Sequence, residues 1–151
     1  MLDPNYIIGL VDGEGSFYVR LNSDVRRRNK VELKFSVKLR YQDKAILEEL
    51  KQFFGCGNVY LQKDTRPKHT DCYRFEVNKK EDVINKIIPF FNENTPKIES
   101  RKRDFKLFKQ IAILSQENMV DLDKIKVLKE QMHWGLAVYG KTVCTVGTPS
   151  N

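Results

Sequence analysis

A carboxylate between two glycines closes a short apolar segment near the start of the chain. The segment reads Ile7-Ile8-Gly9-Leu10-Val11-Asp12-Gly13-Glu14-Gly15. In a helix, Gly9 and Gly13 lie on one face one turn apart, so another helix backbone can approach closely there. Two copies packed through this face would bring two Glu14 carboxylates together near helix C-termini, where negative charge already accumulates. Such a pair favours a divalent cation, because hard cations take oxygen ligands.

The segment resembles the LAGLIDADG motif of the homing endonucleases. Ile7, Ile8 and Val11 occupy apolar positions of the motif. Gly13 occupies the position of its second alanine, and Glu14 that of its last acidic residue. The Gly-Glu-Gly-Ser-Phe continuation, the strand pattern after it and the segment Ile-Glu-Ser-Arg-Lys-Arg-Asp-Phe ending at residue 105 also resemble this family.

This resemblance implies a fold and an activity. The fold is α+β, of the αββαββα homing-endonuclease type, with an antiparallel DNA-binding sheet and an extra C-terminal helix. The activity is site-specific endonuclease cleavage of both strands of a long DNA target, in the service of intron homing. The implied cofactor is Mg²⁺ or another divalent cation such as Mn²⁺ or Ca²⁺, and the reaction is phosphodiester hydrolysis.

The resemblance also assigns roles to single residues. Glu14 would be catalytic and would hold the metal together with the backbone carbonyl of Gly13. Arg101, with Lys102 beside it, falls where the family supplies a basic group near the scissile phosphate, more often a lysine. Arginine stabilises negative charge but does not readily lose a proton, so Arg101 is not expected to act as a base. Asp12 is expected to bond a nearby backbone amide or hydroxyl rather than to catalyse.

One motif and no internal repeat predict a homodimer, because single-motif members of this family typically dimerise. The interface is expected at Ile8, Gly9, Asp12 and Gly13; otherwise the two glycines pack against the sheet of their own chain. Protein two-fold symmetry would be mirrored in a near-palindromic target. The residues also resemble one half of the two-motif fungal mitochondrial enzymes, so a natural homodimer and half of a longer enzyme both stay open.

Composition limits the partners. The 151 residues carry a net charge of +7, which indicates a polyanionic partner or a solvated basic surface, and much of the positive charge is expected on one surface. No apolar run approaches the roughly 20 residues of a membrane helix, so no membrane contact is expected. The N-terminus lacks the features of a signal peptide, so secretion is not expected. The resemblance implies an organelle, mitochondrion or chloroplast, although no targeting segment is visible.

Hydrophobic periodicity orders the chain as helix, hairpin, helix, hairpin and then helices. Paired strands between helices predict an α+β fold with an antiparallel sheet. One domain over residues 1–136 is expected, followed by a tail over 137–151 that lacks a period and is a candidate for disorder. The expected helices cover about 4–13, 43–54, 80–92, 101–116 and 121–133, and the expected strands cover 16–22, 31–41, 58–62 and 72–78.

Polar side chains alternate with core-facing ones along the predicted strands and so gather on one face of the sheet. A two-stranded ribbon can enter the DNA major groove, where Arg and Lys read guanine and Asn and Gln read adenine. Basic residues at the two hairpin tips add positive charge. The predicted DNA-binding residues are Ser16, Tyr18, Arg20, Asn22, Arg26, Arg27, Arg28, Lys34, Ser36, Lys38, Arg40, Asn58, Tyr60, Gln62, Arg66, Lys68, Arg74 and Asn78.

Two alternative functions stay open. The first is a protein that binds nucleic acid without cutting it, as an intron maturase or a repressor; Glu14 argues against lost catalysis. The second is an RNA-binding sheet on which Tyr18 and Tyr60 would stack bases, although the long hairpins and the glycine face favour duplex recognition. His69 and His133 are isolated in the sequence and do not predict a histidine-based site.

Overall fold

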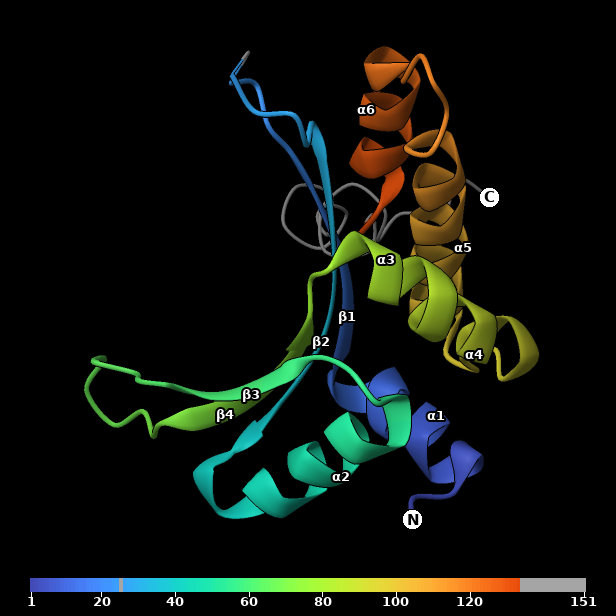
Figure 1. The fold of residues 1–151 in the computed structure, drawn as a ribbon. Coiled ribbons are helices and arrows are strands. Elements are labelled where there is room, and N and C mark those ends of the chain that lie inside the picture. Colours follow the sequence, from blue (N-terminus) through green and yellow to red (C-terminus); the bar gives the residue numbers. More distant parts are fainter. Residues whose placement is uncertain (25, 134–151) are drawn as a thin grey trace, which may run out of the picture.

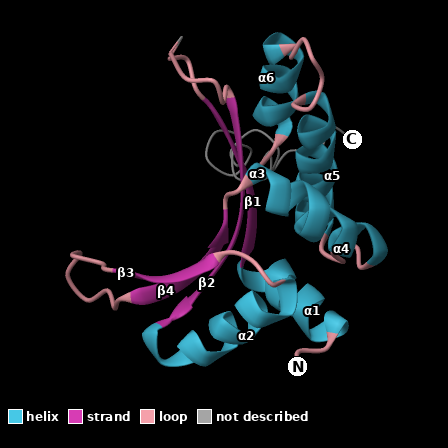
Figure 2. Cartoon of the chain, in the orientation of Figure 1, coloured by secondary structure: helices cyan, strands magenta, loops and turns pink. Residues whose placement is uncertain are grey.

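A four-stranded antiparallel sheet forms the centre of the computed structural model, which describes residues 1–24 and 26–133. The helices gather on one side of this sheet (Figures 1 and 2). The expected fold class is confirmed, and residues 134–151, which include the expected tail, lie outside the described residues. The elements are α1 (Pro4–Glu14), β1 (Gly15–Leu21), β2 (Val31–Arg40), η1 (Tyr41–Asp43), α2 (Lys44–Phe54), β3 (Asn58–Gln62), β4 (Cys72–Val77), α3 (Lys80–Asp82), η2 (Val83–Ile87), α4 (Ile88–Glu93), α5 (Glu99–Leu114) and α6 (Leu122–Gln131).

Helix α1 passes directly into strand β1. The side chain of Asp3 accepts a hydrogen bond from the backbone N–H of Asn5 at 2.7 Å, as an N-cap does. The helix ends one residue later than expected, at Glu14 rather than Gly13. Gly15 makes this junction possible, because a Cβ there would lie 2.6 Å from the Cγ1 of Val11. Glu14 is therefore fixed between the end of a helix and the start of a strand.

The sheet has the strand order β1-β2-β4-β3, so the second hairpin joins the first through its second strand. In the β1–β2 hairpin Phe17 lies opposite Phe35, and in the β2–β4 pair Phe35 lies opposite Val77. Side chains alternate between faces along a strand. These registers therefore collect the apolar positions of β1, β2 and β4 on one face.

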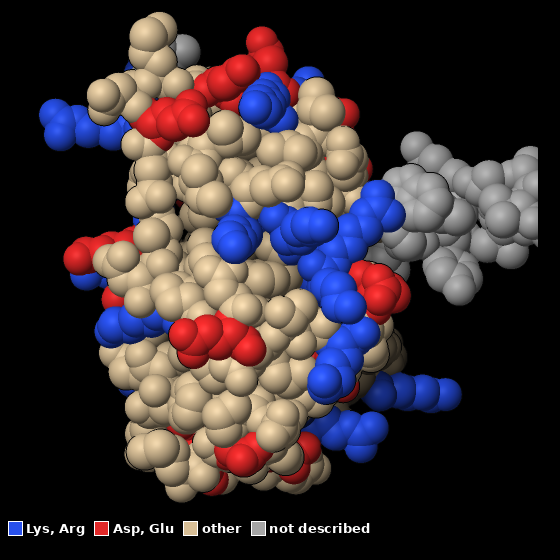
Figure 3. All heavy atoms as spheres, turned by 90° about the vertical axis from the view of Figure 1, so that its right-hand side faces the viewer, with Lys and Arg blue, Asp and Glu red and all other residues tan. Residues whose placement is uncertain are grey.

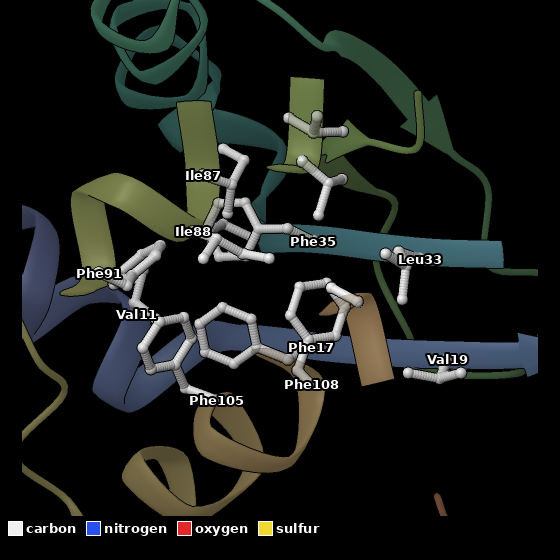
Figure 4. Close-up of a cluster of buried hydrophobic side chains, with 14 of the residues drawn as sticks. Val11, Phe17, Val19, Leu33, Phe35, Ile87, Ile88, Phe91, Phe105 and Phe108 are labelled. Atoms are coloured by element: carbon white, nitrogen blue, oxygen red, sulfur yellow. The ribbon is translucent and has the colours of Figure 1, made fainter. Parts of the chain in front are cut away.

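That apolar face and the helices form one core (Figure 4). Phe17 is completely buried, and its ring centroid lies 5.3 to 5.4 Å from those of Phe91 and Phe108. The three rings come from β1, α4 and α5, so aromatic packing ties the helices to the sheet. The opposite face of the sheet keeps its polar side chains. Among the described residues, no helix combines the length and apolar character needed to cross a bilayer.

The expected helix over 80–92 is interrupted. A π-helical turn, η2, separates α3 from α4, and Pro89 lies in the first turn of α4. Because proline has no N–H, it cannot donate to the carbonyl four residues earlier, and a wider turn accommodates this loss. The expected cap of α2 is also wrong in detail, since Asp43 precedes that helix without a side-chain capping bond. The helices α5 and α6 are close to their expected ranges.

Candidate nucleic-acid interface

Glu14 lies exposed at the edge of a hollow in the polar face of the sheet. The hollow has a volume of about 540 Å³ and is lined by residues from α1, three strands, α5 and the segment after α6. A second hollow of about 390 Å³ also reaches Glu14 and Lys38. The larger hollow is lined by Gly13, Glu14, Gly15, Ser16, Tyr18, Lys34, Ser36, Lys38, Arg74, Arg101 and His133.

The structure brings Arg101 to this hollow but leaves Lys102 outside its lining. The Nζ of Lys102 lies 3.4 Å from the Oε1 of Glu99, in an exposed pair on the first turn of α5. The Nε of Arg101 is buried without a hydrogen-bond partner among the described residues, as is the Nε of Arg74. Buried donors without partners are costly. Arg101 also lines the hollow, where its guanidinium group is suited to an incoming anion.

Glu14 and Gly13 supply oxygen donors of the kind that a hard divalent cation prefers. Within residues 1–24 and 26–133, however, no group of three or more His, Cys, Asp or Glu side chains could hold a metal ion. Among the described residues that line the larger hollow, Glu14 is the one carboxylate. A cation at Glu14 would need further oxygen ligands from a substrate or from a second copy of the chain.

The predicted DNA-binding residues of the strands share the polar face. Adjacent strands place Tyr18 opposite Lys34, and Arg74 opposite both Lys38 and Tyr60. Ser36 is 7% exposed and so offers little surface. The polar positions that the alternation places on this face are Ser16, Tyr18, Arg20, Asn22, Lys34, Ser36, Lys38, Arg40, Asn58, Tyr60, Gln62, Arg74 and Asn78.

The predicted basic residues of the hairpin tips lie in the loops after β1 and β3, and two of them have acidic partners. Arg66 donates two side-chain hydrogen bonds to Asp64, and these bonds hold the pKa of Asp64 below its usual range. Arg27 lies 3.5 Å from the Oε1 of Glu32. Both arginines are largely exposed, so these pairs are weak competitors for phosphate.

The glycine face of α1 is open. A Cβ built on Gly9 or Gly13 would meet nothing within 4 Å, so the sheet of the same chain does not cover these glycines. Ile8 differs, because it is 4% exposed and belongs to the core of its own chain. Asp12 accepts hydrogen bonds from the backbone N–H groups of Lys97 and Ile98, the backbone role expected for it.

His133, which looked isolated in the sequence, lines the hollow beside Arg101. Its backbone N–H and its Nδ1 each lie 2.9 Å from the buried carboxylate of Asp104. Burial opposes the charge on Asp104, but the hydrogen bonds and charge of His133 outweigh it and hold the pKa of Asp104 below its usual value. His133 has φ of 56°, a left-handed conformation that few non-glycine residues adopt. No signal in the sequence predicted this pairing, because the two residues lie 29 positions apart.

Positive charge is not confined to the sheet face. Figure 3 shows basic side chains crossing the helix-covered side as well. The exposed residues of α5 include Lys102, Arg103 and Lys106. Charge alone therefore does not identify the candidate binding face. The alternation of polar side chains and the position of Glu14 identify it.

Comparison with known proteins places this geometry in a family. The family model described as LAGLIDADG endonuclease matches residues 7–112. A probable intron-encoded DNA endonuclease 1 from Mycosarcoma maydis is 33% identical over 107 residues, which cover 70% of this chain and 35% of that protein. This chain thus spans about a third of the length of that relative.

Solved structures agree in fold. The crystal structure of the homing endonuclease I-TnaI has a TM-score of 0.74 and 29% identity, and the match covers 87% of this chain and 88% of that one. I-SmaMI, bound to an uncleaved DNA target in the presence of calcium ions, has a TM-score of 0.75 and 28% identity. That match covers 99% of this chain and 51% of the I-SmaMI chain. Because the family model spans most of the described residues and the fold agrees, the chain belongs to the LAGLIDADG endonuclease family.

Proposed function

We propose that the chain is a homing endonuclease that cleaves both strands of a specific DNA duplex. The observation that carries this proposal is the position of Glu14, at the edge of a hollow lined by Lys34, Lys38, Arg74 and Arg101. The cations around this carboxylate fit a phosphodiester: Lys38 and Arg101 would neutralise its negative charge, whereas Lys34 and Arg74 are paired with Glu76. The names of the relatives, an intron-encoded DNA endonuclease and homing endonucleases, support the same reaction class.

At this site each residue has a distinct task. Glu14 and the carbonyl of Gly13 would hold a divalent cation, with Mg²⁺ as the proposed ion. When bound, such a cation stabilises charge at phosphorus and lowers the pKa of an attacking water. Arg101 would stabilise the negative charge of the phosphate, because its guanidinium stays protonated. The calcium ions named for the I-SmaMI complex support a divalent ion as partner.

The proposed assembly is a homodimer joined through the open glycine face of α1. Helix backbones approach closely where Gly9 and Gly13 leave no side chain, and the chain covers 88% of the I-TnaI chain. A dimer would bring a second Glu14 to the same groove and complete the oxygen ligands that one chain lacks. The chain also covers only half of I-SmaMI, which fits the alternative that it is half of a longer enzyme.

The proposed partner is double-stranded DNA, read by the polar face of the sheet. The DNA target named for I-SmaMI supports this partner. The intron-encoded relative supports intron homing, and we place that activity in an organelle. In the alternative function, the same fold binds nucleic acid without cutting it, as a maturase or a repressor does.

A library experiment tests the proposal. The purified chain is incubated with a randomised DNA duplex library in Mg²⁺, and cut molecules are sequenced; a parallel incubation in Ca²⁺ selects bound molecules. We expect one family of related target sequences in both arms. Glu14→Gln should keep its affinity for the selected duplex and lose cleavage, because it keeps the shape of the side chain but not its charge.

The matched control is Glu49→Gln, which removes one exposed carboxylate from α2, outside both hollows. It should cleave like the wild type. Selection without cleavage by the wild type would favour the non-cleaving alternative. Cleavage by Glu14→Gln at the wild-type rate would remove Glu14 from the chemistry.

A further inference from the structure

A carboxylate lies nearly buried in the middle of the polar sheet face. Glu76 belongs to β4, opposite Ser36 on β2 and Asn58 on β3. The residue is only 7% exposed. An acid at the centre of a surface that binds an anion is unexpected, since it repels phosphate, and burial makes an unpaired carboxylate costly.

Three side chains from three strands, and that of Asn78 just after β4, converge on this carboxylate. The hydroxyl of Tyr60 donates to Oε2 at 2.8 Å, and the Nδ2 of Asn78 donates to Oε1 at 3.4 Å. The Nζ of Lys34 lies 3.3 Å from Oε1, and a guanidinium nitrogen of Arg74 lies 3.8 Å from Oε2. Glu76 is thus the common partner of two cations and two neutral donors.

All four of these side chains belong to the predicted DNA-binding set. Burial, followed by the hydrogen bond to Glu76 and its charge, raises the pKa of the Tyr60 hydroxyl. Tyr60 therefore remains a neutral donor directed at Glu76. The side chains of Lys34 and Arg74 are 34% and 28% exposed, so they still reach the surface while their charged groups are paired with Glu76.

Two physical consequences follow. Long side chains lose rotamer entropy when they are ordered. Here Lys34 and Arg74 are ordered when the chain folds, so less entropy is lost when DNA binds. The carboxylate also offsets the charges of Lys34 and Arg74, so their attraction for phosphate at any sequence is reduced. Ordered side chains favour hydrogen bonds to base edges, which depend on the DNA sequence. Compensation of the two positive charges by Glu76 weakens phosphate contacts, which do not depend on sequence.

We propose that Glu76 is a positioning residue that sets DNA sequence discrimination. It fixes Lys34, Arg74 and Tyr60 in one arrangement and withholds the two cations from nonspecific phosphate binding. This inference rests on the proposed function, because it requires that the sheet face binds duplex DNA.

Glu76→Gln tests the role, and Glu32→Gln is the matched control. Glu32 lies on the same face, accepts a hydrogen bond from Asn22, and its side chain is 37% exposed. Both variants remove one negative charge from the face. Glu32 pairs with a single cation, Arg27, and with Asn22, whereas Glu76 is shared by two cations and two neutral donors. Affinity is measured over a series of salt concentrations for two probes, a duplex selected by the wild type from a random library and a duplex of scrambled sequence.

Glu76→Gln should bind the scrambled duplex more tightly, and its log–log salt slope should steepen by up to about 1.8, or about 0.9 for each released cation. Its preference for the selected duplex should fall at least about fivefold, the lower range for one lost base contact. Glu32→Gln should keep the wild-type preference and show a smaller change in slope. A merely structural role of Glu76 would not steepen the slope.

Tyr60→Phe provides a second test that leaves the charge unchanged, and it serves if Glu76→Gln does not fold in a denaturant titration. It should lower the preference for the selected duplex and leave the salt slope as in the wild type. An unchanged preference in Tyr60→Phe, or a Glu76→Gln variant indistinguishable from Glu32→Gln, would overturn the inference. A wild type that selects no duplex at all would instead contradict the proposed function.

Discussion

The carboxylate of Asp12 accepts hydrogen bonds from the backbone N–H of Lys97 at 3.1 and 3.2 Å. A third bond, at 3.3 Å, comes from the N–H of Ile98, the residue that precedes α5. The side chain of Ile98 makes no capping bond of its own. Asp12 therefore ties the segment just before α5 to α1, 85 residues earlier in the chain, and fixes the helix that carries Arg101 against the helix that carries Glu14.

Asp12→Ala should destabilise the fold by about 1–2 kcal/mol, because the N–H groups of Lys97 and Ile98 lose hydrogen bonds to a charged acceptor. It should also lower cleavage more than DNA affinity, because Arg101 loses its fixed position relative to Glu14. Urea unfolding and cleavage assays measure the two effects. The control Asp24→Ala removes a local bond to the N–H of Arg26 in a hairpin loop and should not separate cleavage from affinity.

Gly9→Leu should convert dimers to monomers without unfolding the chain. A Cβ at this position would meet nothing within 4 Å in the isolated chain, and leucine favours helix over glycine by up to about 1 kcal/mol. A partner helix packed on this face would clash with the leucine. Sedimentation equilibrium measures the assembly, and Gln52→Leu on the exposed face of α2 is the control for added apolar surface. Dimers that persist in Gly9→Leu would place the interface elsewhere.

Lys38→Ala should weaken DNA binding and flatten the salt slope by about 0.9, the contribution of one neutralised phosphate. Lys38 lines both hollows beside Glu14, so its charge is placed near the proposed scissile phosphate. Lys106→Ala, on the exposed surface of α5, removes the same charge away from the sheet. Equal slopes for the two variants would count against a local phosphate contact at Lys38.

Asp104→Asn should destabilise the chain by about 1–3 kcal/mol at neutral pH, because it weakens both buried bonds to His133. The pKa of Asp104 is lowered in the folded chain, so its stabilisation is present above the unfolded pKa of about 3.9 and is lost as the pH falls through the folded pKa. The stability difference between the wild type and Asp104→Asn should therefore shrink only below about pH 4.

Denaturant unfolding across that pH range measures the difference. Glu117→Gln, an exposed carboxyl after α5, should change stability by less than about 0.5 kcal/mol. A difference for Asp104→Asn that stays constant into the acid range would contradict the assigned linkage.

Local sequence patterns predicted most of the fold. The alternation around Phe17 and Phe35 predicted two strands with an apolar face, because a strand has a period of two residues. The π-helical turn at Val83–Ile87 was not predicted, since its apolar residues keep helical spacing and only Pro89 departs from the pattern. The strand order could not follow from the sequence, because pairing of β2 with β4 is a long-range contact.

The sequence predicts the part of the candidate site that lies in one continuous segment. Glu14 and the glycines are neighbours in the chain, and the motif defines their spacing. Glu76 and His133 were missed because their roles come from partners far away in sequence: Lys34 for Glu76 and Asp104 for His133. Alternation placed Glu76 on the polar face but could not reveal that its carboxylate is buried and shared.

If the sheet reads DNA as proposed, the length of β2 limits how much sequence one chain can read. Its ten residues, at about 3.3 Å each, extend over about 33 Å, close to the 34–36 Å of one turn of the double helix. A single sheet can therefore follow about ten base pairs, however many side chains it presents. Recognition of a longer stretch requires a second sheet end to end with the first. The strand length therefore sets the length of the target, whichever bases the side chains contact.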